Sequence, residues 1–258
     1  MEYFDSHCHL NDEQMLVNID EQIALLRQAG ITAALCIGYD LASSKRAVEL
    51  ANTYPEIYAA VGIHPDNAAE CSKEAIEELR KLAQDPNVIA IGEIGLDYYW
   101  HKDPEERAAQ KPVFVSQIKL ADELGLPISV HARDAIEDTY RILKENNPKF
   151  GGVLHCYSGS VEMMREFLKL GLYFGFDGPI TYKNAVTPKQ CVRECPADRL
   201  LVETDSPYLS PTPFRGKPNN PKNIPYIVAE MARIRECDEA LMNEQLWKNF
   251  KKMFRVKQ

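Results

Sequence analysis

The sequence predicts an α/β protein with the (β/α)8 architecture of a TIM barrel, and three observations support this prediction. The chain has 258 residues, and a barrel of this kind occupies about 250. Eight short runs are apolar on consecutive positions, which is typical of parallel strands covered on both faces. Amphipathic segments with helical periodicity alternate with these runs. An open doubly wound sheet has the same periodicity, so the pattern leaves open whether the sheet closes.

The expected elements follow one another without a linker, an internal repeat or a low-complexity tract, which predicts one domain over residues 1–258. Strands are expected at residues 3–7, 31–38, 57–64, 88–96, 127–132, 152–157, 172–178 and 200–206. Helices are expected at residues 15–30, 43–54, 72–85, 112–125, 135–146, 160–171, 224–236 and 240–254. Several of these helical segments end in glycine or asparagine, which favour a helix C-terminus.

One segment after the last expected strand has a different composition. Residues 206–226 contain six of the 16 prolines. Proline fixes φ and cannot donate a backbone hydrogen bond, so we expect a stiff excursion over the surface here and no helix or strand.

Composition and charge narrow the class of protein. The chain is 45% hydrophobic and 26% charged, as globular proteins are. Its net charge of −8 excludes a broad basic face that coats nucleic acid. The seven cysteines form no C-x-x-C pair, which indicates reduced thiols. No signal sequence and no long apolar run is seen, so we expect a cytoplasmic protein that does not enter a membrane. Nothing in the sequence fixes the number of subunits, and a monomer is the simplest expectation.

Polar residues inside the expected strands carry the functional information. His7 and His9 are two residues apart, so in an extended segment both side chains point to one face and Cys8 points to the other. One histidine in a strand is usually a core residue that hydrogen-bonds a backbone carbonyl. Two imidazoles on the same face need two separate partners, which makes a metal site as good an interpretation as a structural one.

Further ionisable residues lie toward the C-terminal ends of other expected strands: Glu93, His131, His155, Glu203 and Asp205. In a (β/α)8 barrel these ends all meet at one face, where active sites of this fold are built. So many buried ionisable groups need compensation, and a divalent cation supplies it. Imidazole and carboxylate ligands suit Zn²⁺, Mn²⁺ or Fe²⁺, and Mg²⁺ less well.

Other sites are less specific. His64 precedes a proline, so it belongs either to a strand end or to a turn. The aromatic residues Tyr98, Tyr99 and Trp100 either pack or stack on bases, and packing is the commoner role. The chain has no phosphate-binding glycine loop, no dinucleotide-binding glycine motif and no serine-hydrolase elbow.

Six ordered motifs resemble those of the TatD family of metal-dependent deoxyribonucleases, within the amidohydrolase-like superfamily. They read YFDSHCHLN, VGIHP, IGEIGLDYY, PISVHARDAIED, LHCYSG and LLVETDSPYLSP. The resemblance runs from Tyr3 to the C-terminal helices and implies a barrel with two divalent ions. By this resemblance His7, His9 and Asp205 would hold one ion, and His131 and His155 the other. Glu93 would bridge both ions.

The resemblance also implies roles around the metals. Glu203 is expected near the scissile phosphate or the attacking water, with Asp205 orienting that water and taking its proton. Candidate phosphate-binding residues are His64, Arg133, Tyr157, Ser158 and Arg215. The expected substrate is DNA, either single-stranded or at an end, cleaved at its phosphodiester bonds.

Two alternatives remain open at this point. The same metal-activated water could attack a carbonyl, which would make the protein an amidohydrolase acting on a small amide, ester or lactone. The basic residues between Arg215 and Lys222, together with Arg133, favour phosphate over such a substrate. The other alternative is a barrel with a structural metal or a nucleic-acid-binding scaffold. Open coordination positions argue against it, because six ligands shared by two ions leave room for water and substrate.

Overall fold

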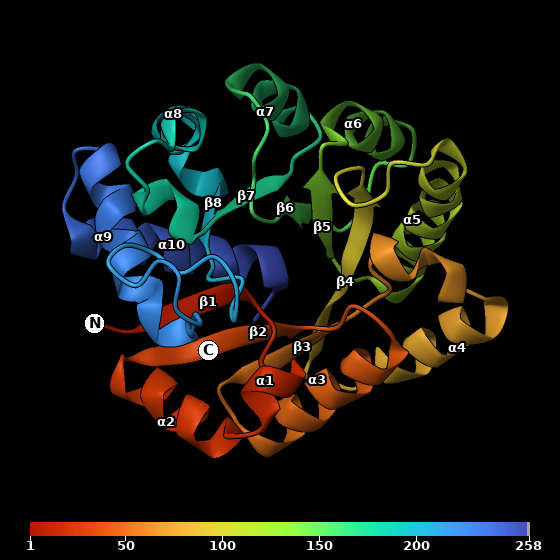
Figure 1. Cartoon of the computed structure of the whole chain (residues 1–258), viewed down its shortest axis with the longest axis horizontal. Helices are drawn as coiled ribbons and strands as arrows, with labels where there is room; N and C mark the ends of the chain where they lie inside the picture. The colour runs from red at the N-terminus through yellow and green to blue at the C-terminus, as the bar shows by residue number, and fades with distance from the viewer. Residues whose placement is uncertain (257–258) are drawn as a thin grey trace.

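The computed structural model describes residues 1–256 and shows eight parallel strands whose order in the sheet is their order in the chain (Figure 1). The strands are β1 (Tyr3–Cys8), β2 (Ile31–Ile37), β3 (Ile57–Val61), β4 (Val88–Asp97), β5 (Ile128–Arg133), β6 (Gly152–Leu154), β7 (Tyr173–Phe176) and β8 (Leu200–Val202). All eight fall where the sequence predicts strands, so the (β/α)8 prediction is confirmed.

Backbone hydrogen bonds join the last strand to the first. Beyond the end of β8, the N–H of Asp205 donates to the carbonyl of His7 at 2.9 Å, and the N–H of His9 donates to the carbonyl of Ser206 at 2.7 Å. The buried carboxylate of Asp5 adds a bond from the Thr204 N–H at 3.0 Å. These bonds hold the segment after β8 against β1, so the barrel is nearly closed, whereas the first and last strands of a doubly wound sheet would lie apart.

Helices surround the sheet on the outside, as Figure 1 shows. They are α1 (Glu13–Leu16), α2 (Ile19–Gln28), α3 (Leu41–Thr53), α4 (Lys73–Leu82), α5 (Pro104–Leu124), α6 (Ile136–Glu145), α7 (Val161–Leu168), α8 (Val186–Glu194), α9 (Ile224–Ile234) and α10 (Glu239–Phe254). Within residues 1–256, no helix is long and apolar enough to cross a bilayer.

Two helix boundaries differ from the sequence prediction. The helix expected from residue 112 begins at Pro104, because Asp103 caps it by accepting the Glu105 N–H at 2.7 Å. Pro112 therefore lies inside α5, where it removes one backbone hydrogen bond without ending the helix. The helix expected over residues 15–30 is divided into α1 and α2, because the backbone at Asn18 is not helical.

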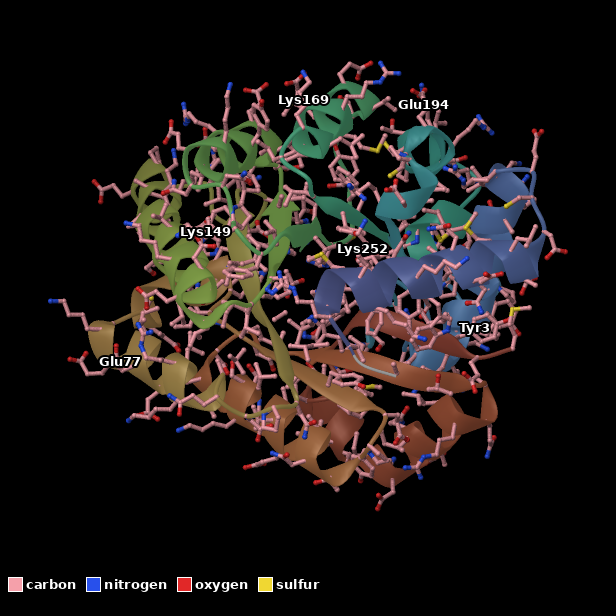
Figure 2. All side chains as sticks on the ribbon, turned by 180° about the vertical axis from the view of Figure 1, so that it is seen from behind. Tyr3, Glu77, Lys149, Lys169, Glu194 and Lys252 are labelled. Carbon is pink, nitrogen blue, oxygen red and sulfur yellow. The ribbon has the colours of Figure 1, made fainter. Side chains whose placement is uncertain are left out.

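The far side of the barrel is covered by α10. Seen from behind in Figure 2, α10 crosses the molecule, and the labelled Tyr3 and Lys252 lie on this face. Trp247 and Asn243 of α10 donate to the carbonyl of Glu2, which is just before β1, at 2.8 and 2.7 Å. Phe250 packs on Phe4 with ring centroids 4.5 Å apart. This end of the barrel is filled by apolar packing, so the functional groups gather at the other end.

The proline-rich segment after β8 contains no strand or α-helix before α9. Asn219 fastens it to the barrel: its backbone N–H donates to the carbonyl of Pro207, and its side chain donates to the carbonyl of Thr204, both at 2.9 Å. The segment thus lies against the C-terminal end of β8, beside the metal-ligand candidates.

Candidate metal centre

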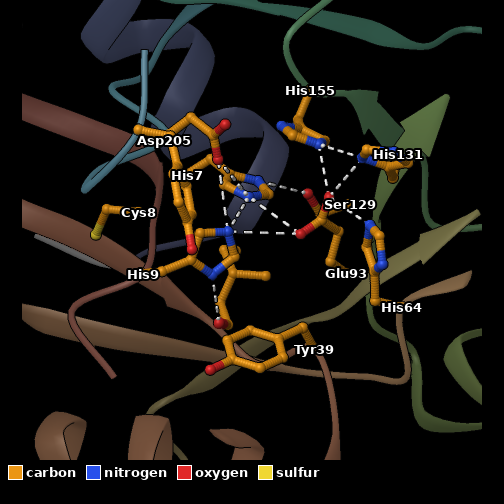
Figure 3. A network of polar contacts seen from close by, with 12 residues as sticks. His7, Cys8, His9, Tyr39, His64, Glu93, Ser129, His131, His155 and Asp205 are labelled. Carbon is orange, nitrogen blue, oxygen red and sulfur yellow. Dashed lines mark hydrogen bonds and ion pairs between the residues drawn. The ribbon is translucent and has the colours of Figure 1, made fainter. Parts of the chain in front are cut away.

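The two histidines of β1 converge, as their spacing predicts. The Nε2 atoms of His7 and His9 are 3.3 Å apart. The side chain of Cys8 points the other way and lies 3.4 Å from the carbonyl of Leu35 in β2 (Figure 3). Two imidazole nitrogens this close satisfy each other only if one carries a proton, whereas a cation beside them satisfies both.

Glu93 of β4 lies at the middle of the cluster (Figure 3). Its Oε2 atom is 3.6 Å from the Nε2 atoms of both His7 and His9. Its Oε1 atom is 2.9 Å from His131 Nδ1 and 2.7 Å from His155 Nε2. The two oxygens of one carboxylate therefore face two separate pairs of imidazoles.

Asp205 completes the first of these groups. Its Oδ1 atom lies 3.7 Å from His7 Nε2 and 3.5 Å from His9 Nε2. Nitrogen and oxygen ligands about 2.0–2.2 Å from one tetrahedral ion are about 3.3–3.6 Å from each other. The separations among His7, His9, Glu93 and Asp205 are close to these values, so this donor set fits a divalent ion. Side chains of His64, Glu93 and His131 form another group close enough to share an ion.

Hydrogen bonds on the outer side of the cluster orient the imidazoles. His9 Nδ1 lies 3.1 Å from the carbonyl of Ile37, so it donates there and leaves Nε2 as the free nitrogen. His131 Nε2 lies 3.0 Å from Asp97 Oδ2, so its Nδ1 is the nitrogen that faces Glu93. His9 and His131 thus each turn toward the centre the ring nitrogen that is available to bind a metal.

Asp97 was not among the site residues predicted from the sequence. It is the last residue of β4 and is 1% exposed. In the sequence it is followed by three aromatic residues, so it resembles the start of a surface loop. Its position four residues after Glu93 on a strand was the available signal, since residues at even spacing share a face.

Replacing Asp97 by asparagine is expected to weaken metal binding about 10- to 100-fold, the usual cost of losing such an outer partner. The amide places an N–H donor opposite His131 Nε2, which favours the tautomer protonated on the Nδ1 atom that faces Glu93. Metal affinity measured by competition with a chelating dye checks this result. Asp198→Asn, the same change at an exposed residue, is the control, and equal affinity in both variants would remove Asp97 from the site.

The strongest electrostatic interaction in the cluster is between Glu93 and His155. Burial alone would raise the pKa of Glu93, but the charge of His155 and the hydrogen bonds from His131 and His155 hold that pKa well below its usual range. Burial alone would lower the pKa of His155, but the charges of Glu93 and Glu203 and their hydrogen bonds together raise it well above its usual value. The two groups form a buried ion pair when no metal is bound.

Glu203 lies behind the cluster and not in the substrate space. It is fully buried, and Ser6 donates to its Oε2 at 3.2 Å. Its Oε1 accepts the N–H of Cys156 at 2.5 Å and lies 3.6 Å from His155 Nδ1. These contacts place Glu203 beside His155, and its closeness to the scissile phosphate or the attacking water stays a prediction.

A cavity of about 630 Å³ opens over the cluster. Of the predicted phosphate-binding residues, those that line this cavity can contact a ligand there. His64, Arg133, Tyr157 and Ser158 line it. The hydroxyl of Tyr157 already donates to the carbonyl of Ser160 at 2.8 Å. Arg215 is not part of the lining: its guanidinium carbon lies 4.4 Å from the centroid of the Tyr182 ring. The cavity thus brings together four of the five predicted phosphate-binding residues.

A further acid in the cavity wall was missed by sequence reasoning. Asp177 follows β7, is 3% exposed, and its Oδ2 atom has no hydrogen-bond partner. Burial, with the nearby charges of Glu203 and Asp205, raises its pKa well above the usual range. In the sequence, the feature that could have identified Asp177 was again an acidic residue at the end of an expected strand.

Comparison with known proteins agrees with this geometry. The family model described as TatD related DNase matches residues 4–255. The Bacillus subtilis (strain 168) protein called uncharacterized metal-dependent hydrolase YabD is 42% identical over 254 residues, which are 98% of this chain and 99% of that protein. The Erwinia tasmaniensis protein called 3'-5' ssDNA/RNA exonuclease TatD is 35% identical over 261 residues, 98% of this chain and 100% of that protein.

A solved structure agrees as well. The crystal structure of YjjV, a TatD homolog from Escherichia coli K12, matches with a TM-score of 0.93 and 28% identity, covering 99% of this chain and 98% of that one. The match to the family model extends over nearly all of the barrel, and the relatives share its full length. The chain therefore belongs to the TatD family of metal-dependent hydrolases.

Proposed function

We propose that this hydrolase cleaves phosphodiester bonds of DNA and that its centre holds two divalent ions. The observation that carries the proposal is the arrangement of Glu93, whose two oxygens face two different groups of imidazoles beneath an open cavity. The name of the Erwinia relative, an exonuclease for single-stranded DNA and RNA, supports a nucleic-acid substrate.

The donor set indicates how the ions would be held. His7, His9 and Asp205 would bind one ion, His131 and His155 would bind the other, and Glu93 would bridge them. Imidazole nitrogens favour Zn²⁺, Mn²⁺ or Fe²⁺ over Mg²⁺. When bound, such ions lower the pKa of a water molecule and neutralise charge on the phosphoryl oxygens.

In this proposal Asp205 acts on the attacking water. It lines the cavity, and its side chain is 15% exposed. Only Oδ1 faces the histidines of β1, so Oδ2 is left to accept a hydrogen bond. In this proposal Asp205 orients the water for in-line attack on phosphorus and takes its proton.

In this proposal His64 holds the substrate phosphate. Its Nδ1 accepts the N–H of Asp66 at 3.1 Å, so in the neutral ring the proton is on Nε2. Burial lowers the pKa of His64 to about 4, which keeps the ring neutral at physiological pH. His64 Nε2 lies 3.6 Å from Glu93 Oε1, so its N–H points to the centre and donates to a phosphate oxygen.

Arg133 would bind the strand next to the cleaved bond. It is exposed at the end of β5 and is the one arginine or lysine in the cavity lining, within the residues that the structure describes. A guanidinium is suited to phosphate because it donates two parallel hydrogen bonds. Ser158, exposed at the same wall, adds a hydroxyl. The cytoplasmic location and the monomeric state expected from the sequence stay predictions.

Digestion of end-labelled single-stranded DNA tests the proposal. His131→Ala and Asp205→Ala are each expected to keep the fold and to lower kcat/KM about a thousandfold. Each substitution removes a metal ligand, and Asp205→Ala also removes the proposed general base. A chelator should abolish the activity of the parent protein. Full activity in both variants would place the reaction elsewhere.

A panel of lactones and small amides separates this proposal from the amidohydrolase alternative. Labels at the 3′ and 5′ ends report the polarity of cleavage, and replacement with Zn²⁺, Mn²⁺, Fe²⁺ or Mg²⁺ reports the metal preference. Hydrolysis of the panel without cleavage of DNA would favour the alternative.

A further inference from the structure

An exposed tryptophan lies at the rim of the catalytic cavity. Trp100, three residues after the end of β4, is 65% exposed, and its neighbour Tyr99 is 41% exposed. Trp100 also lines the cavity that opens over the metal-ligand candidates. Large aromatic side chains are usually well buried, so one left in water beside an active site indicates a binding surface.

Cationic side chains flank this aromatic pair. The guanidinium carbon of Arg133 is 4.0 Å from the centroid of the Tyr99 ring and 5.6 Å from that of the Trp100 ring. Lys102 Nζ is 5.1 Å from the Tyr99 centroid. The rings of Tyr99 and Trp100 meet at 84° in an edge contact, and Trp100 stays 65% exposed beside it. Tyr99 thus holds the cations in place, and Trp100 offers a ring face.

One carboxylate ties this rim to the metal centre. Asp97 Oδ1 accepts the N–H groups of Tyr99 and Trp100, each at 2.9 Å. Its Oδ2 bonds His131 Nε2 at 3.0 Å. Because Asp97 is buried and bonds both, it ties the backbone at Trp100 to the metal-ligand candidate His131.

We propose that Trp100 and Arg133 form a stacking platform for one base of a single-stranded nucleic acid whose scissile phosphate lies at the metal centre. The inference rests on the proposed function and deepens it. Bases in a duplex are covered by their neighbours on both faces, so only an unpaired strand offers a face to Trp100. Arg133 and Lys102 attract the phosphates on either side of that base.

Two acidic groups near the platform lie beside a histidine. Asp66 and Glu106 lie 3.0 and 3.1 Å from the two ring nitrogens of His101. A histidine between two carboxylates reduces the repulsion that they would exert on a polyanion. Arg133 and Lys102 remain the cations that flank the aromatic pair and attract the strand.

The experiment combines a protein variant with a substrate variant. We expect Trp100→Ala to raise KM for a thymidine octamer about tenfold, within the range measured when stacking side chains are removed. The value of kcat should change less than about twofold. Trp100→Phe, which keeps a ring, should restore most of the affinity. Leu241→Ala, at a residue 63% exposed on α10, is the matched control and should leave KM unchanged.

Octamers with a single abasic nucleotide locate the stacked base. With the parent protein, one abasic position should raise KM about as much as Trp100→Ala does. With an octamer that is abasic at that position, Trp100→Ala should raise KM no further, because the abasic nucleotide and the substitution remove the same contact. An RNA octamer tests whether the platform also accepts ribonucleotides. A blunt DNA duplex should bind more weakly than the single strand.

Three results would overturn the platform. They are an unchanged KM in Trp100→Ala, effects that add at every abasic position, and equal KM values for duplex and single strand. In each of these cases the parent still cleaves DNA, so the proposed function stands. A parent protein that cleaves none of the oligonucleotides would overturn the proposed function and the platform together.

Discussion

Glu93→Gln is expected to lower kcat/KM for DNA about a thousandfold while the protein stays folded. Metal ions supply several kcal/mol of transition-state stabilisation, and every 1.4 kcal/mol changes the rate about tenfold. Glutamine has the shape of glutamate but replaces one metal-binding oxygen by an N–H₂ donor. Because each oxygen of Glu93 faces a different group of histidines, the change affects both halves of the centre.

Metal content measured by plasma emission gives an independent readout for this variant. The parent is expected to bind two equivalents of Mn²⁺ or Zn²⁺, and Glu93→Gln fewer than two at the same free concentration. Glu194→Gln, the same chemical change at the exposed end of α8, serves as the control. If Glu93→Gln bound metal and cleaved DNA like the parent, Glu93 would not be the bridge.

Removal of the metals is expected to lower the melting temperature, and by more at alkaline than at acidic pH. At a free metal concentration of about 100 times Kd, binding stabilises the fold by about 2.7 kcal/mol. For a chain of this size each kcal/mol shifts Tm by about 2–4 °C, so chelation should lower Tm by about 5–10 °C near pH 8.

The pH dependence follows from the ion pair of the metal-free centre. The pKa of His155 is raised well above its ordinary value, because the charges and hydrogen bonds of Glu93 and Glu203 together outweigh the effect of burial. The pair therefore stabilises the metal-free fold fully below the ordinary histidine pKa, and this stabilisation is lost as pH rises through the raised pKa. A metal ion binds only when that proton has left, so its stabilising effect grows with pH.

Thermal melts with and without chelator, from about pH 5.5 to about pH 8.5, test this prediction. The difference in Tm should be smallest at the acidic end. A difference that stays constant, or that grows as the pH falls, would show that the ligand histidines do not exchange a proton for the metal.

The convergence of the metal-ligand candidates was predictable from the sequence. His7, Glu93, His131 and Asp205 are distant in the chain, but each lies near the C-terminal end of a short apolar run. The rule that these ends share one face of a barrel was enough to bring them together. The spacing of His7 and His9 also fixed the outward direction of Cys8 correctly.

Other features of the site could not be predicted from the sequence and are seen only in the structure. The sequence shows that Glu203 follows β8, but only the hydrogen bond with the Cys156 N–H shows that its carboxylate turns away from the cavity. Arg215 lies ten residues beyond Asp205 in an irregular segment, and no periodicity gives the direction of such a chain. Its contact with Tyr182 depends on the path of that segment. The start of α5 was missed because Pro104 and Pro112 are equally good helix starts by composition.

Anomalous diffraction from crystals soaked in Mn²⁺ tests directly whether Glu93 bridges two ions. We predict two anomalous peaks, one beside each oxygen of Glu93. The first should lie within bonding distance of His7, His9 and Asp205, and the second within bonding distance of His131 and His155. A single peak that contacts only one group of histidines, or peaks that lie away from Glu93, would contradict a two-ion centre bridged by this carboxylate.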